Sequence, residues 1–324
     1  MLNKYYDGTP LIIKLSVEVG KLLGAIDAGN LRKPKTKLRR ENKIKTIHSS
    51  LMIEGNTLSL EQVSDIIDNK RVFGPSKDIL EVKNAIVVYE KLNEFDAFEE
   101  KSYLEAHRIL MKGLIGQAGQ YRTRGVGIFK GDKVAHLAPP AWNVSNLMNG
   151  LFEYLKKGED GIIVKSCVFH YEMEFIHPFM DGNGRMGRLW QTKILMRENP
   201  VFEYLPIEAE ILKSQQRYYD VLGQCDREGV STKFIEYMLE IIQISLRELI
   251  GKQRASLSEK ERLEYFINYF EGTAFARKDY LKMFTNISGA TASRDLKYGI
   301  EIGILEKYGE KRNTTYRIKK HDND

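Results

Sequence analysis

The sequence predicts a mainly α-helical protein, in which a helical core with one β-hairpin precedes a small winged helix-turn-helix module. Apolar residues recur three and four positions apart along most of the 324 residues, as they do on one face of a helix. One short stretch alternates in period two instead, and the composition changes after residue 253. At roughly 150 residues per domain, the length fits about two domains.

The composition is that of a globular protein, with 42% hydrophobic and 29% charged residues. The 50 Lys and Arg against 44 Asp and Glu leave a net charge of only +6, which disfavours a protein that coats nucleic acid. Cys167 and Cys225 both lie in apolar segments, so we expect packed thiols in a reducing compartment. The chain has neither a signal-peptide pattern at its start nor an apolar run of about eighteen residues. We therefore expect a soluble cytoplasmic protein with no membrane partner.

Helical periodicity divides the chain into an N-terminal helical region (1–100), a core (101–250) and a C-terminal module (251–324). The segments with the clearest pattern are 11–28, 60–69, 79–92, 102–114, 144–157 and 234–249. Residues 31–45 hold eight basic side chains against the single acidic Glu41. We interpret this run as a solvated helix face.

The exception to the helical pattern is a predicted hairpin. Residues 125–130 and 133–137 read as short strands around Gly131-Asp132, and Pro139-Pro140 ends the second strand. A lone hairpin is not a stable sheet by itself. It therefore needs a partner, either the helices beneath it or a bound peptide.

The C-terminal module is predicted to contain helices at 258–270, 277–284 and 289–298, followed by strands at 304–308 and 314–318. This order resembles a winged helix. In that family, the third helix with Arg294 and Lys297 would enter a DNA major groove, and Lys311 and Arg312 would contact phosphates. Residues 252–324 hold 15 basic and 11 acidic residues. Because this surplus is small, another protein is an alternative partner to DNA.

The most informative stretch runs from His177 to Arg188 and starts where a helix should end. A helical pattern covers 162–176, and Pro178 biases His177 away from the helical region. In the loop 181–184, two glycines let successive N–H groups turn toward one point. The next helix begins at once and aims its positive end at the same place. These features predict an anion-binding site.

Charged side chains extend this site. Arg185 and Arg188 lie three residues apart on the first turn of the second helix, so both can clamp phosphates. Asp181 would oppose a bare anion but suits Mg²⁺ bridging the protein and phosphate oxygens. His177 supplies a base that titrates near neutral pH. A zinc-type site of His170, His177 and Asp181 is an alternative whose spacing is incomplete.

The stretch from His177 to Arg188 resembles the signature of the Fic family, H-x-F-x-[D/E]-G-N-G-R-x-x-R, and meets every fixed position. The resemblance reaches from the N-terminal helices to about residue 250. It implies an all-helical Fic core that transfers AMP from ATP to a Ser, Thr or Tyr hydroxyl of a target protein or of itself, with pyrophosphate leaving. ATP and a protein substrate are the implied partners.

The same resemblance implies a role for each matched residue. His177 would deprotonate the target hydroxyl, and Asp181 would hold Mg²⁺. The phosphate-binding residues would be those of the loop and the following helical turn, with Arg188 on the γ-phosphate: Gly182, Asn183, Gly184, Arg185 and Arg188. The hairpin resembles the family's target-binding flap, whose expected contacts are Ile128, Phe129, Lys130 and Gly131.

Residues 215–222 resemble the family segment near the adenine. Tyr218 or Tyr219 would stack on the base, although an aromatic pair on an amphipathic helix more often belongs to the core. Asp226 stands where some relatives have an asparagine that contacts the ribose or base. This departure leaves the nucleotide preference open.

A predicted helix over 41–56 places Ile44, Ile47 and Leu51 on one stripe, and Glu54 continues that stripe. A buried carboxylate there needs a partner, and Ser50 lies one turn before it. The alternative is an ordinary glutamate at a frayed helix end. Ser50 to Gly55 fits the Fic inhibitory motif [S/T]-x-x-x-E-[G/N], which implies that Glu54 pairs with Arg188 and inhibits the enzyme.

The sequence thus predicts a self-inhibited protein adenylyltransferase, with three rivals. One is a Fic enzyme that transfers a different group. The second is a DNA-binding regulator whose Fic core only senses nucleotide. The third is a de-adenylylase in which Glu54 activates water. Both a monomer and a homodimer remain open.

Overall fold

The structure is a computed structural model that describes residues 5–29, 31, 33–130, 133–255, 257–270, 272–284, 287–310 and 313–319. The chain forms two compact units. The first contains Met1–Leu23 and Arg32–Leu246, and the second contains Gly24–Leu31 and Arg247–Asp324. The regions 1–100 and 101–250 thus lie largely in one unit.

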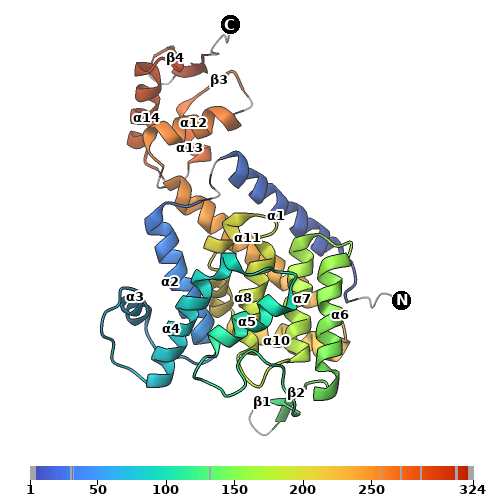
Figure 1. Ribbon diagram of the computed structural model, residues 1–324. Helices are drawn as coiled ribbons and strands as arrows, with labels where there is room; N and C mark the ends of the chain where they lie inside the picture. Colours follow the sequence, from blue (N-terminus) through green and yellow to red (C-terminus); the bar gives the residue numbers. More distant parts are fainter. Residues whose placement is uncertain are drawn as a thin grey trace. The chain divides into compact units, whose positions relative to one another are not determined.

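The first unit is helical apart from one hairpin (Figure 1). Its main helices are α1 (Pro10–Ala28), α2 (Thr36–Ile53), α3 (Leu60–Ile67), α4 (Ser76–Glu90), α5 (Glu100–Leu110), α6 (Val144–Lys157), α7 (Ile162–Ile176), α8 (Asn183–Leu195), α9 (Ile207–Lys213), α10 (Gln215–Glu228) and α11 (Thr232–Ala255). Helices α1 and α11 each continue into the second unit. Short 3₁₀ turns, η1 (Leu92–Glu94), η2 (Ala141–Asn143) and η3 (Pro200–Tyr204), complete the connections. The predicted helices over 144–157 and 162–176 are confirmed at both ends.

Helices α7 and α8 run side by side in the interior of this unit (Figure 1). Gly187 permits their close approach, since a Cβ there would lie 2.7 Å from side-chain atoms of His170 and Met173. An aromatic cluster around Tyr103 packs beside them, with its ring 5.1 Å from Trp190 and 5.4 Å from Phe179. This core supports the loop between α7 and α8.

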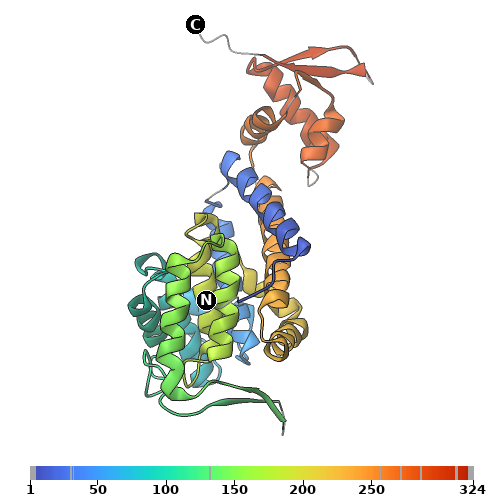
Figure 2. The ribbon, with the colours of Figure 1, turned by 90° about the vertical axis from the view of Figure 1, so that its right-hand side faces the viewer.

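The hairpin consists of β1 (Gly127–Lys130) and β2 (Lys133–Leu137), paired antiparallel with a register shift between Ile128 and Phe129. Figure 2 shows the strands leaving the helices as a narrow ribbon. The two strands form a sheet of their own, and β2 lies against α10. The predicted flap contact Gly131 lies outside the described residues.

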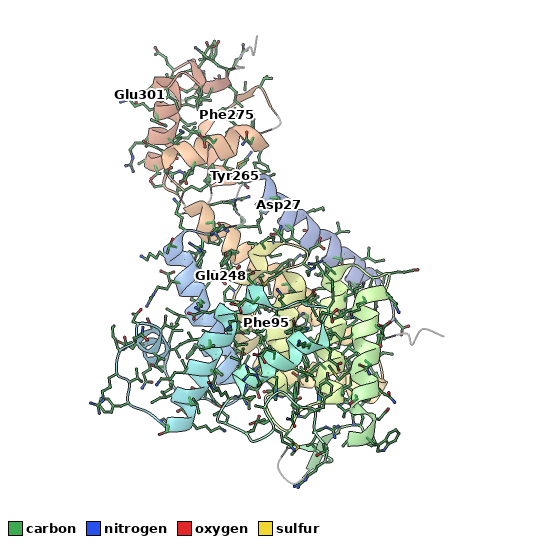
Figure 3. All side chains as sticks on the ribbon, viewed as in Figure 1. Asp27, Phe95, Glu248, Tyr265, Phe275 and Glu301 are labelled. Carbon is green, nitrogen blue, oxygen red and sulfur yellow. The ribbon has the colours of Figure 1, made fainter. Side chains whose placement is uncertain are left out.

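The second unit contains α12 (Glu259–Tyr269), β3 (Ala274–Phe275), α13 (Arg277–Met283), α14 (Gly289–Glu301), β4 (Leu305–Tyr308) and β5 (Thr315–Ile318). Its sheet is antiparallel, in the order β3-β5-β4. Phe275 is labelled in Figure 3, and its ring packs 4.5 Å from that of Phe266. The helices and the last two strands follow the predicted order. Strand β3 is not predicted from the sequence, because its two residues are too few to show alternation.

Three sequence predictions can be checked directly in the fold. Cys167 and Cys225 are free, buried thiols, as predicted, and burial raises the pKa of Cys167 to about 12. Part of the basic run at the start of α2 is paired, Arg40 with Asp68 at 2.7 Å and Lys43 with Glu90 at 2.9 Å. Within the described ranges, no helix combines the length and apolar character needed to cross a bilayer.

Candidate active site

The imidazole of His177 lies directly after the last residue of α7. His177 has a left-handed backbone conformation, with φ of 51° and ψ of 60°, which costs a non-glycine residue of order 1–3 kcal/mol. Its Nδ1 lies 3.4 Å from the carbonyl oxygen of Glu174. A carbonyl only accepts, so Nδ1 carries the hydrogen in this contact and Nε2 is the basic nitrogen.

The loop after His177 is closed by buried side chains. The Asn183 amide accepts from the N–H of Phe179 and donates to its carbonyl, both at 2.9 Å. His107 on α5 lies 3.0 Å from the Asp181 carbonyl through Nε2 and accepts from the N–H of Gly119 through Nδ1 at 2.8 Å. Its ring stacks on Phe179 at 3.5 Å. The Asn183 side chain therefore holds the loop, and the phosphate contact expected of residue 183 stays a prediction for its main-chain N–H.

Burial fixes the protonation state of His107. Its side chain is fully buried, and desolvation lowers the pKa of the imidazole to about 4. At neutral pH the ring is therefore neutral and donates through Nε2. The hydrogen bond from His107 Nε2 to the Asp181 carbonyl holds the loop in one orientation.

The predicted anion site lies at the N-terminus of α8. Gly182 is the helix N-cap with φ of 86°, a conformation that favours glycine. Gly184 is needed for space, because a Cβ there would lie 2.3 Å from Oε1 of Glu54 and 3.2 Å from Nη1 of Arg188. The carboxylate of Glu54 thus lies against the helix N-terminus, where an anion is favoured.

Arg188 connects this site to the end of α2. Its Nη2 donates to Oε1 of Glu54 at 2.8 Å and to the Ser50 carbonyl at 2.9 Å, and its Nε donates to the Ser50 hydroxyl at 3.2 Å. The buried Nη1 of Arg188 has no hydrogen-bond partner in the described part of the chain. Burial alone would lower the pKa of Arg188, but the nearby Glu54, with Tyr218 and Glu174, raises it above its ordinary value. The guanidinium therefore stays charged.

The end of α2 differs in one respect from the prediction. Gly55, with φ of 90°, lets the N–H groups of Gly55 and Asn56 return to the carbonyls of Met52 and Leu51, which is the Schellman helix ending. The helix therefore stops at Ile53, and the prediction that Glu54 is buried on the stripe is wrong. Its side chain is 33% exposed, whereas that of Arg188 is 1% exposed.

Arg185 is also held by carboxylates of the chain itself. Its Nη1 pairs with Oε1 of Glu81 on α4 and its Nη2 with Oδ1 of Asp181, both at 3.0 Å. The second oxygen of Glu81 accepts from Asn56 Nδ2 at 2.8 Å. Asn56 directly follows the motif of residues 50–55. The segment 50–56 is therefore connected to both arginines of α8.

The carbonyl of Ile53 accepts two hydrogen bonds from α10, one from Gln215 Nε2 at 3.0 Å and one from the Tyr219 hydroxyl at 3.2 Å. Tyr219 is 43% exposed. Tyr218 is buried, and its hydroxyl lies 3.1 Å from Nε2 of His170. Tyr218 therefore belongs to the core, and of the two tyrosines only Tyr219 is exposed.

Two other predicted ligands have partners within the chain. Asp226 accepts from the Tyr171 hydroxyl at 3.0 Å. His170 is buried between Tyr218 and Gln191, whose Oε1 lies 2.7 Å from its Nδ1, so it does not join His177 in a zinc site. Among the residues that the structure describes, no cluster of three His, Cys, Asp or Glu side chains is placed to hold a metal.

Asp181 fits the single-carboxylate type of magnesium site. Its side chain is 47% exposed, and its Oδ1 accepts from Arg185 and, at 2.5 Å, from the N–H of Gly182. One exposed carboxylate beside an anion site is what Mg²⁺ uses when phosphates and water supply its other ligands. The residues present therefore fit the ion.

Three residues that the sequence did not predict, His107, Glu81 and Arg122, contact the site from α5, α4 and the segment before β1. All three are buried polar groups. A polar or charged residue on the apolar side of a helical pattern is the local signal for His107 and Glu81, whereas Arg122 lies outside any helix and has no such signal.

The fold and site define a helical protein in which a histidine lies beside a helix N-terminus that carries two buried arginines. Residues 97–195 match the model of the Fic/DOC family. The structure is similar to that of a Fic family protein from Desulfovibrio desulfuricans G20, with 38% identity, a TM-score of 0.73 and coverage of 99% of both chains. The chain belongs to the Fic family.

Curated relatives are similar over part of their length. "Protein adenylyltransferase Fic" of Nematostella vectensis is 30% identical over 67% of this chain and 50% of its own. The Culex quinquefasciatus protein of the same name is 32% identical over 68% of this chain and 43% of its own. The chain thus spans about half the length of these relatives, or less.

Proposed function

We propose that this chain is a protein adenylyltransferase that transfers AMP from ATP to a side-chain hydroxyl and is restrained by Glu54. The observation that carries the proposal is the juxtaposition of His177 with a helix N-terminus whose two buried arginines are both held by carboxylates of the same chain. Such arginines have the geometry to bind phosphates instead.

In the proposed reaction, His177 acts as the general base. Nε2 takes the proton of the target hydroxyl, the hydroxyl oxygen bonds to the α-phosphorus, and the bond from that phosphorus to the bridging oxygen breaks. Pyrophosphate leaves with the electron pair of the broken bond. The N–H groups at the start of α8 and Arg185 would stabilise the phosphates, and Arg188 would hold the γ-phosphate.

Asp181 would hold Mg²⁺, which supplies neutralisation of phosphate charge when bound. Asp181 already accepts from Gly182 and Arg185. The loop bonds from Asn183 and His107 keep its backbone in place. We therefore infer that the loop positions the Asp181 carboxylate.

The restraint follows from competition for one guanidinium. Oε1 of Glu54 occupies the position against Gly184 and Arg188 where a phosphate oxygen would bind. While the pair persists, ATP cannot place its γ-phosphate on Arg188, and the α-phosphate is not aligned for attack. Exposure of Glu54 at the helix end makes its displacement feasible.

We assign target binding to the hairpin. Its two strands form a sheet of their own. An extended target segment can therefore add to an edge of this sheet through main-chain hydrogen bonds. Proline at Val134, which pairs with Phe129, should reduce modification of other proteins more than it reduces nucleotide affinity. Equal loss of both would make the hairpin only structural.

The test of the proposed function uses Glu54→Gly with Mg²⁺, cell lysate and ATP labelled in its α-phosphate. We expect labelled proteins whose modified peptides gain the mass of one AMP group, and no labelling with His177→Ala in the same background. A different added mass would instead identify another transferred group. Absence of any modification would reject transfer.

Removal of AMP is a second candidate, because the part-exposed Glu54 carboxylate lies within the anion site. There it could activate a water molecule for attack on a phosphodiester. Offering AMP-modified protein separates the two activities. Hydrolysis by the wild type that is lost in Glu54→Gly would support removal.

DNA binding by the second unit is a third candidate, favoured by the exposed side chains of Arg294 and Lys297 on α14. Lys297 lies 3.5 Å from Glu301, which weakens the positive field. The predicted wing contacts Lys311 and Arg312 lie outside the described residues. Salt-dependent binding to a duplex that weakens in Arg294→Ala would support this function.

A further inference from the structure

Arg122 is a buried arginine whose guanidinium, within the described part of the chain, donates to four main-chain carbonyls. Its Nε donates to the His177 carbonyl at 2.8 Å, and its Nη2 donates to those of Ile176 at 3.2 Å and Pro139 at 2.5 Å. Nη1 donates to the Arg124 carbonyl at 2.9 Å. Only 2% of the residue is exposed, so this arrangement is part of the interior.

The main chain of Arg122 adds a further bond to the same loop. Its N–H donates to the Pro178 carbonyl at 2.9 Å. One residue therefore satisfies three consecutive carbonyls at and after the end of α7, those of residues 176 to 178. Carbonyls at a helix C-terminus lack partners within the helix and carry partial negative charge, so a cation is favoured there.

No carboxylate in the described ranges forms an ion pair with Arg122. A buried guanidinium without such a partner is costly unless its N–H groups are satisfied. Here they are satisfied by two segments that meet beside His177. This geometry requires the fork of arginine, because a lysine ammonium is a single point of charge.

The two segments are the helix end and the base of the hairpin. Arg124 precedes β1 and Pro139 follows β2, so the guanidinium binds the chain on both sides of the hairpin. The same group binds the carbonyl of His177, whose left-handed conformation needs support from its surroundings. The distance from hairpin base to His177 is therefore fixed through one side chain.

We infer that Arg122 is a positioning residue that holds the hairpin base and His177 in one arrangement, so that a hydroxyl on a hairpin-bound segment meets the imidazole. This inference rests on the proposed function. It assigns no contact with ATP to Arg122. Loss of the guanidinium should therefore affect transfer to a protein much more than binding of the nucleotide.

The test compares Arg122→Lys and Arg122→Met with the wild-type residue, all in the Glu54→Gly background. We expect the rate of AMP transfer to fall about 100-fold, as small displacements of reacting groups do, with ATP affinity within about threefold of the parent. Lys165→Met is the matched control. The 9%-exposed Lys165 donates to the Leu155 carbonyl at the end of α6 at 3.0 Å, away from the site.

A second readout does not depend on transfer. The imidazole resonances of His177, assigned by their loss in His177→Ala, should shift in Arg122→Lys without any nucleotide and stay in place in Lys165→Met. Melting temperatures show whether each variant is folded, and the lysine variant is included because the methionine variant removes the buried cation entirely. If the Glu54→Gly parent fails to transfer AMP, the proposed function fails, and the resonances still decide the role of Arg122.

The inference is overturned if the His177 resonances do not move in Arg122→Lys. It is also overturned if a folded Arg122 variant transfers AMP at the parent rate, or if ATP affinity falls in step with transfer. The last result would show a general collapse of the site.

Discussion

Two segments meet at the N-terminus of α8, and they are held in different ways. The loop 177–183 is bound by Asn183, His107 and Arg122, which donate to main-chain carbonyls inside the protein. The segment 50–56 is bound to Arg188 and, through Asn56 and Glu81, to Arg185. The donors of the first set bind main-chain carbonyls, which phosphates do not replace. Phosphates compete directly with the carboxylates of Glu54 and Glu81 for the arginines of the second set.

Under the proposed function, this difference separates a permanent framework from a removable restraint. A ligand that takes Arg188 would release Glu54 without disturbing the bonds of the loop. Mutations in the loop should therefore reduce activity or stability, whereas mutations in segment 50–56 should relieve inhibition.

The largest expected effect is that of His177→Ala. Loss of a general base typically costs about 10²–10⁴-fold in rate, and we expect that loss in AMP transfer by the Glu54→Gly protein. ATP affinity should be largely retained, because the imidazole is not among the groups assigned to the phosphates. Isothermal titration with ATP and initial rates of labelling measure the two quantities. An alanine variant as fast as its parent would contradict the assigned role of His177.

The framework should also have a characteristic pH dependence. The pKa of His107 is lowered from 6.5 to about 4 in the folded protein, so between these values the unfolded chain binds a proton that the folded chain does not. The free energy of unfolding should therefore decrease as the pH falls from 6.5 to 4. One pKa unit corresponds to 1.36 kcal/mol, so His107 alone should lower the free energy of unfolding by about 3 kcal/mol over this range.

Denaturant titrations of the wild type and His107→Gln at several pH values measure this contribution. Glutamine can retain the hydrogen bond made by Nε2 but does not titrate, so the stability difference between the two proteins should shrink as the pH falls to 4. If the stability difference between the two proteins stays constant from pH 6.5 to 4, titration of His107 does not cause the pH dependence of stability.

The smallest effect concerns the second carboxylate of the restraint. Glu81→Gln keeps the shape of the side chain but removes its charge beside Arg185, which Asp181 still contacts. We expect ATP to bind about threefold more tightly, as measured by isothermal titration. Glu105→Gln, which removes the surface pair with Arg108, is the control and should change nothing. Unchanged affinity in Glu81→Gln would restrict the restraint to Glu54.

Local sequence signals predicted much of this site. The helix over 162–176, the histidine at its end and the loop before the second helix all follow from periodicity, proline and glycine. The Fic resemblance supplied the pairing of Glu54 with Arg188, residues 134 positions apart. What the pattern did not predict was the exposure of Glu54, because α2 ends at Ile53 before the stripe reaches that residue.

The residues that orient the site were not predictable from the sequence. Arg122 reaches His177 across 55 positions, His107 reaches Asp181 across 74, and Glu81 reaches Arg185 across 104. These contacts depend on how the helices pack against one another. The residues that determine this packing are spread along the chain, so no local sequence pattern indicates the contacts. Tyr218 shows the same limit, since its position beside Tyr219 does not reveal which of the two faces the core.

The central claim is that Glu54 holds Arg188 away from ATP, and the most direct measurement is the initial rate of AMP incorporation from saturating ATP and Mg²⁺. The proteins compared are the wild type, Glu54→Gly, Arg188→Ala and the double variant. A charged hydrogen bond is worth about 1.5–3 kcal/mol, so we predict that Glu54→Gly is roughly 10- to 100-fold faster than the wild type and that Arg188→Ala removes this gain. A Glu54→Gly protein no faster than the wild type would contradict the claim and leave Glu54 as an ordinary carboxylate at a helix end.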